Sequence, residues 1–155
     1  MSDEKLIETA QTFLGGDASV EAAGIFQPRG TTGAMEGAMG AGLSTDNLVG
    51  ELAGAAASVG AGAAMSAAQD VPRWTLLAVT PTTLHAIACG QHGVGWQPES
   101  TFATFDRSRI QVTVHARVNV RTLTVDDPDT GRRYEWEGNR IGPAHAKDVI
   151  EVLQA

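Results

Sequence analysis

Cysteine and basic residues are scarce in this sequence, and each scarcity excludes a class of protein. The single Cys89 has no partner for an internal disulfide, which excludes a disulfide-stapled domain and fits a reducing compartment. Residues 1–70 hold two basic and nine acidic residues, whereas residues 71–155 hold nine of each, so the net charge of −7 belongs to the first part. Because this distribution offers no basic surface, we expect no nucleic-acid partner.

Motifs of the common catalytic classes are also missing. No glycine-rich stretch ends in Gly-Lys-Ser/Thr, no strand-to-helix dinucleotide fingerprint is present, and no nucleophile-elbow pattern occurs. The start "MSDEKLIETAQTFL" has no basic stretch followed by an apolar run, so it is not typical of a secretory leader. We therefore expect a cytoplasmic protein that is not an enzyme and needs no cofactor.

Two groups of residues resemble metal sites only superficially. His85, Cys89 and His92 lack the second cysteine or adjacent acid that a four-ligand zinc site needs, so we expect a buried thiol and ordinary polar histidines. The aspartates of "DDPDTG" could suggest calcium, but beside proline and glycine they are more simply explained as turn formers. No metal site is predicted.

The first thirty residues predict a helix and then a strand. Apolar residues recur at spacings of three and four within residues 1–16, after a possible cap at Ser2 or Asp3, and Gly15-Gly16 ends the pattern. The stretch "SVEAAGIFQPRG" predicts a strand from Ser19 to Phe26, stopped by Pro28.

Between Thr31 and Asp70 large side chains almost disappear, and small residues recur every fourth position. This register predicts two helices, 31–43 and 46–69, that form an inserted hairpin, since small residues at that spacing let two helix backbones approach closely. Each interior glycine costs about 1 kcal/mol of helix propensity, so packing must stabilise such helices. The residues expected to form this contact are Gly33, Gly37, Gly50, Gly54, Ser58 and Gly62.

From Arg73 onward the apolar period becomes two. "RWTLLAVTPTTLHAIAC" predicts two strands that turn at Pro81-Thr82, and "GQHGVGWQPES" predicts a glycine-rich loop. In "RIQVTVHARVNVRTLTVDD" the apolar residues from Ile110 to Val120 share one parity, whereas Leu123 and Val125 have the other, so the run must bend, bulge or turn near residues 115–121. "DDPDTGRRYEW" predicts a hairpin with Gly131 in the left-handed position. "GPAHAKDVIEVLQ" predicts a final helix beginning near Pro143, with one apolar face made of Ala146, Val149, Ile150 and Leu153.

The strand–turn–strand "LLAVTPTTLHAIA" and the segment "LTVDDPDTGRRYEW" before the helix "AHAKDVIEVL" resemble the small bacterial pleckstrin-homology-like (PH-like) domains. The resemblance covers residues 19–28 and 71–155 and implies an α+β fold: an antiparallel barrel or sheet closed by the C-terminal helix, with segment 31–70 inserted after the first strand. Relatives that bind phosphoinositides use basic residues around that first connection. Here Arg29 and Arg73 flank an acidic insertion, so we expect a poor phosphate site.

Three functions remain open for such a chain. The first is a non-enzymatic scaffolding protein that forms a homo-oligomer through a glycine-zipper-like hairpin. The second is a peripheral membrane protein that inserts the hairpin at a lipid surface, although Glu51 would cost about 2.5 kcal/mol or more near a bilayer centre and argues against spanning. The third is a small-ligand-binding barrel with a groove lined by Trp74, Trp96 and Trp136.

Overall fold

A computed structural model describes residues 2–31, 71–93, 95–117, 120–139 and 146–155 of the chain. They form an open seven-stranded antiparallel sheet with a helix at each end of the chain, which confirms the α+β class. Of the hairpin predicted for residues 31–70 only Thr31 is described, and the start of the final helix near Pro143 also lies outside the described residues.

Helix α1 (Asp3–Leu14) begins where the sequence predicted. The side chain of Ser2 accepts a hydrogen bond from the backbone nitrogen of Lys5 (3.4 Å) and caps the first turn. Leu6 and Ala10 are fully buried on one face, and the helix ends at Gly15, whose φ of 99° is unfavourable for other residues.

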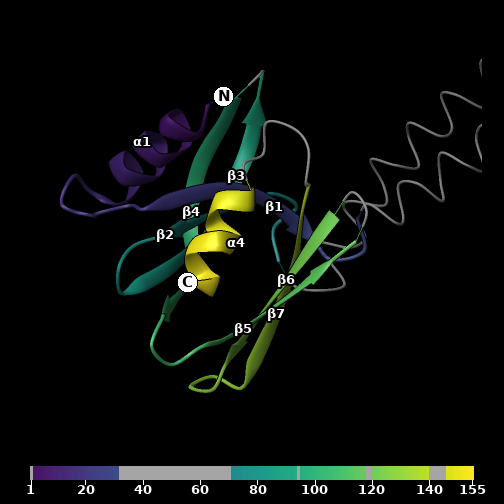
Figure 1. Ribbon diagram of the computed structural model, residues 1–155. Coiled ribbons are helices and arrows are strands. Elements are labelled where there is room, and N and C mark those ends of the chain that lie inside the picture. The colour runs from purple at the N-terminus through teal and green to yellow at the C-terminus, as the bar shows by residue number, and fades with distance from the viewer. Residues whose placement is uncertain (1, 32–70, 94, 118–119, 140–145) are drawn as a thin grey trace, which may run out of the picture.

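The seven strands follow one another along the sheet in the order β4-β3-β2-β1-β7-β6-β5. Their bounds are β1 (Ala22–Pro28), β2 (Thr75–Val79), β3 (Thr83–His92), β4 (Gly95–Asp106), β5 (Gln111–Ala116), β6 (Val120–Asp127) and β7 (Arg132–Asn139). Strand β1 joins the two parts of the sheet, because residues 22–26 pair with β2 and residues 27–28 pair with β7. Figure 1 shows β1 running between the two groups of strands.

The sheet is buried on both faces at β1 and β2. We call the face covered by helix α4 (Ala146–Gln154) the inner face and the face covered by α1 the outer face (Figure 1). Side chains alternate between two apolar clusters: Leu77 and Val79 join the inner core, whereas Leu76 and Ala78 join the outer core. All five residues of β2 are buried, which explains its continuous apolar character.

Helix α4 approaches β7 closely where two small residues, Ala146 and Gly138, face each other. Ala146, Val149 and Ile150 are buried on the inner core, as the spacing of the final helix predicted. At Gly138 an added Cβ would overlap the Cβ of Ala146 and approach the ring of Phe26 at 3.0 Å. The absence of a side chain at Gly138 therefore lets the helix lie close to the sheet.

Two local predictions were wrong. The stretch "GQHGVGWQPES" is not a loop, because β3 continues to His92, turns at Gly93 with φ of 59°, and returns as β4 from Gly95. The two strands stay paired up to this turn, since Gly90 pairs with Gln97 and His92 pairs with Gly95. This pairing offsets the low strand propensity of the glycines. Strand β1 begins at Ala22 rather than Ser19 and includes Pro28, which pairs with Trp136 of β7.

Candidate functional site

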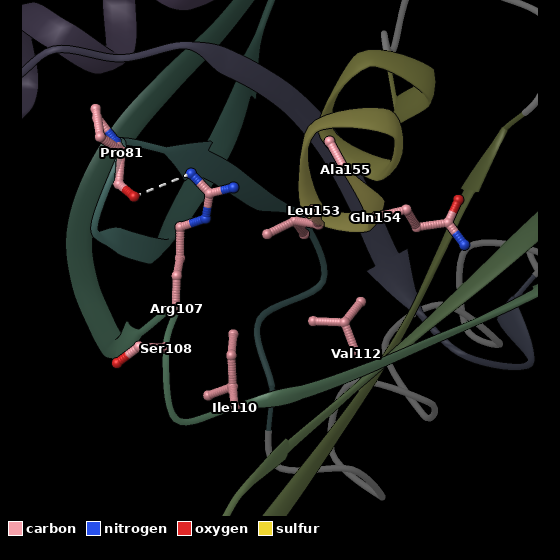
Figure 2. A pocket seen from close by; sticks show the side chains of 8 residues that line it. All are labelled: Pro81, Arg107, Ser108, Ile110, Val112, Leu153, Gln154 and Ala155. Atoms are coloured by element: carbon pink, nitrogen blue, oxygen red, sulfur yellow. Dashed lines mark hydrogen bonds between the residues drawn. The ribbon is translucent and has the colours of Figure 1, made fainter.

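A groove of about 610 Å³ lies where the end of α4 meets the turn between β4 and β5 (Figure 2). One part of its wall is polar and the other is apolar. The residues that line it are Pro81, Arg107, Ser108, Ile110, Val112, Leu153, Gln154 and Ala155. They come from the β2–β3 turn, the β4–β5 turn, β5 and the end of the chain, so tertiary structure alone brings them together.

Arg107 organises the polar wall. Its Nη1 donates to the carbonyl oxygen of Thr80 at 2.7 Å and to that of Pro81 at 3.3 Å, the latter drawn in Figure 2. Its Nη2 donates to the carbonyl oxygen of Val152 in the last turn of α4 at 3.1 Å. Nη1 also lies 3.2 Å from Oε2 of Glu21, just before β1. The guanidinium thus holds α4 against the sheet and complements the negative end of the helix dipole.

The β4–β5 turn is held by Asp106. Oδ1 of Asp106 accepts hydrogen bonds from the backbone nitrogen of Ser108 at 2.9 Å and from its hydroxyl at 2.7 Å. These bonds, helped by the nearby charge of Arg109, hold the pKa of Asp106 below its ordinary value. The Ser108 hydroxyl is therefore engaged in a local turn with an ionised carboxylate, and no described histidine lines the groove to activate it.

The apolar wall continues the inner core to the surface. Ile110, Val112 and Leu153 are partly buried against that core, and Val114 continues the row along β5. Beside them, β4 and β5 are the two end strands in the order of the described sheet. An apolar strip next to an edge strand suits an extended polypeptide segment, which can use both backbone hydrogen bonds and side-chain contacts.

The three tryptophans do not form one ligand groove. Trp74 and Trp96 pack together beside the outer core, with ring centroids 4.7 Å apart, and the guanidinium of Arg73 lies 5.6 Å from the Trp74 ring centroid. Trp136 is fully buried in the inner core and stacks on Tyr134 at 5.4 Å. The alternative of a groove lined by all three does not fit this arrangement, because Trp136 and the Trp74–Trp96 pair belong to different apolar clusters.

Cys89 is a buried thiol on the outer face, as predicted. Its burial, reinforced by the negative charge of Glu99, raises the pKa of Cys89 to about 12. Partial burial lowers the pKa of His85. An added Cβ at Gly90 would lie 2.8 Å from Oε1 of Glu99 and 3.3 Å from Nε2 of His92. Within the described ranges, no three histidine, cysteine or acidic side chains are grouped so that they could hold a metal.

The aspartates of the β6–β7 hairpin form the predicted turn. Oδ1 of Asp127 accepts from the backbone nitrogen of Asp129 at 3.0 Å, and its Oδ2 accepts from the hydroxyl of Thr130 at 3.0 Å. Asp126 pairs with Arg133 at 2.7 Å, and Gly131 has the predicted left-handed backbone with φ of 70°. These carboxylates are committed to local contacts rather than gathered around one ion.

The residues predicted to mediate self-association lie outside the described part: Gly33, Gly37, Gly50, Gly54, Ser58 and Gly62. The described residues show the two points at which segment 31–70 joins the sheet. Phe26 of β1 pairs directly with Thr75 of β2. Thr31 and Val71 are both buried, and the hydroxyl of Thr31 donates to the carbonyl oxygen of Pro28 at 2.7 Å.

Sequence reasoning missed the groove and the role of Arg107. The parity of Ile110, Val112 and Val114 was recognised, but the identity of the edge strands depends on long-range pairing between β1 and β7. No local pattern around Arg107 indicates that its partners lie just before β1, in the β2–β3 turn and on α4.

Two further findings bear on function. Among the helices of the described ranges, none has the length and apolar character needed to cross a membrane. Searches with protein-family models, curated protein sequences and solved structures give no match to this chain.

Proposed function

We propose that this chain is a non-enzymatic interaction protein that self-associates through the small residues of segment 31–70. The four-residue rhythm of Gly50, Gly54, Ser58 and Gly62 supports close helix contact, since each small residue removes the bulk that keeps two backbones apart. Gly33 and Gly37 of the same segment supply the facing surface.

The observation that carries this proposal is the pairing of Phe26 with Thr75. Because these residues are direct neighbours in the sheet, the chain leaves β1 and re-enters at β2 within about one strand spacing. A segment attached at two adjacent points can contact a second copy without disturbing the pairing of the other strands. The buried side chains of Thr31 and Val71 anchor both ends.

The strand arrangement also supports the resemblance to PH-like domains. Seven antiparallel strands precede a helix that packs on the inner core, in the order this resemblance implies. Phosphoinositide binding at the first connection is disfavoured, because Nη1 of Arg29 already pairs with Oε1 of Glu135 at 2.9 Å. An interaction domain without the usual phosphate ligand is the proposal these contacts favour.

Gly54→Leu tests the proposal in the full chain. The leucine side chain should block close approach and lower the native mass measured by light scattering. Gly54→Ala is the matched control, because a single methyl group raises helix propensity while preserving a small surface. An unchanged mass for Gly54→Leu overturns the proposed function.

Flotation with liposomes separates this function from the membrane alternative. Self-association alone predicts that the purified protein stays at the bottom of the gradient with both neutral and anionic vesicles. Flotation with either vesicle would favour lipid insertion instead, because the chain carries a net charge of −7 that opposes simple adsorption to anionic lipid.

A further inference from the structure

The two edge strands of the sheet differ in how well they are protected from pairing. Strand β4 contains Pro98 and has two irregularities in its pairing with β3, where Glu99 and Phe102 have no direct partner. Proline, charge and bulges are features that prevent an edge from accepting another strand. Strand β5, by contrast, has continuous pairing with β6 and contains no proline, lysine, arginine or acidic residue.

The backbone of β5 presents a regular set of groups on the side away from β6, which we call its open side because no described strand pairs with β5 there. Arg117 donates from its backbone nitrogen to the carbonyl oxygen of Val120 at 2.7 Å, which makes this a hydrogen-bonded pair. Since such pairs alternate along an antiparallel ladder, Gln111, Thr113 and His115 bond to β6. The backbone groups of Val112, Val114 and Ala116 therefore point away from β6, towards the side of β5 on which no described strand pairs.

We propose that β5 pairs with β5 of a second copy of this chain, antiparallel and centred on Val114. In this register Val112 and Ala116 of the two copies form reciprocal hydrogen-bonded pairs, and Val114 pairs with itself. Each outward-facing N–H and C=O of the three residues then has a partner. The two sheets become one continuous sheet related by a twofold axis, which closes the assembly as a dimer.

The side chains of β5 fit a second copy of the same strand. Val112 and Val114 are partly buried against the inner core, and pairing covers the apolar strip beside Ile110 and Leu153. On the opposite face Thr113 meets His115 of the other copy, and both side chains are exposed in the single chain. An uncharged strand can pair with itself without the repulsion that an acidic or basic edge would produce.

Cysteine cross-linking tests this register in the full-length protein. Thr113 and His115 of the paired copies form a non-hydrogen-bonded pair with Cα atoms about 4.5 Å apart, a distance that a disulfide can span. The variant carrying Thr113→Cys and His115→Cys should therefore form a covalent dimer under mild oxidation. Thr113→Cys alone should not, because position 113 faces position 115. The buried native Cys89 gives little background.

Charge variants provide a second measurement that does not depend on disulfide geometry. Thr113→Lys with His115→Lys places two like-charged pairs across the twofold axis and should weaken the dimer about tenfold. Thr113→Lys with His115→Glu is the matched control, because each lysine then faces a glutamate and the dimer should persist. Both positions are exposed, so neither variant disturbs the core.

The results separate this interface from assembly through segment 31–70. Gly54→Leu should leave the cross-link between positions 113 and 115 intact, even where it lowers the native mass. Failure of the double-cysteine variant to cross-link, equal cross-linking by Thr113→Cys alone, or equal dimer dissociation constants for the two charge variants overturns the β5 pairing. None of these three outcomes depends on the result for Gly54→Leu.

Discussion

Replacing Arg107 with alanine should loosen the contact between α4 and the sheet. The variant removes the donors to the carbonyl oxygens of Thr80 (2.7 Å) and Val152 (3.1 Å), both in partly buried positions. Hydrogen bonds from a charged donor contribute about 1.5–3 kcal/mol each, so complete loss of both would cost about 3–6 kcal/mol. The Arg107 side chain is 22% exposed, and water can replace part of this interaction. We therefore expect a loss of about 2–3 kcal/mol.

The matched control is Glu21→Ala, which removes only the carboxylate partner of Arg107. The Glu21 side chain is 41% exposed, so its ion pair should contribute less than about 1 kcal/mol and weaken further in salt. Urea unfolding followed by circular dichroism measures both variants, and hydrogen exchange should show the largest increase in α4 for Arg107→Ala. If Glu21→Ala destabilised the protein as much as Arg107→Ala, the carbonyl contacts would not be the source of the stability.

Two further predictions concern close packing and the buried thiol. Gly138→Ala should lower the free energy of unfolding by about 1–3 kcal/mol, because the added Cβ would overlap Ala146 and press on Phe26. Thermal unfolding measures this loss, with Gly16→Ala as the comparison, because Gly16 is exposed and an added Cβ there meets no heavy atom within 4 Å. The raised pKa of Cys89 means that the unfolded thiol ionises near pH 9 while the folded thiol stays protonated to about pH 12. Wild-type stability should therefore fall between these values relative to Cys89→Ala, and a parallel pH dependence of the two proteins would contradict the assignment.

Local chemistry made most individual elements predictable. The parity change between Val114 and Leu123 excluded one uniform strand and left a bend, a bulge or a turn open. The structure shows a turn, because Val114 of β5 and Leu123 of β6 are direct cross-strand partners. The Pro81-Thr82 turn and the left-handed Gly131 depend on backbone preferences that are encoded within a few residues. The final helix was recognisable because Ala146, Val149 and Ile150 share one face.

Long-range pairing made the remainder unpredictable. The glycines at 90, 93 and 95 favour a loop locally, yet β3 and β4 continue through this region because each strand supplies the other's backbone partners. The change of partner along β1 from β2 to β7 determines which strands lie at the edges. The groove near Arg107 and the open side of β5 follow from that change, so no window of local sequence contains them.

Replacing residues 32–70 with about five glycine and serine residues tests whether the segment contributes to the stability of its own sheet. The replacement shortens the connection between β1 and β2 about fourfold, which should stabilise the folded sheet by about 1.2 kcal/mol if the removed residues contact another copy. Thr31 and Val71 are retained, so the buried anchors at both ends remain. Urea unfolding should be compared with that of full-length Gly54→Leu, in which the proposed assembly through the segment should already be weakened. If the shortened chain were less stable than Gly54→Leu, the small residues would be packing on their own sheet. They would then not be available to contact a second copy, which would contradict the proposed self-association.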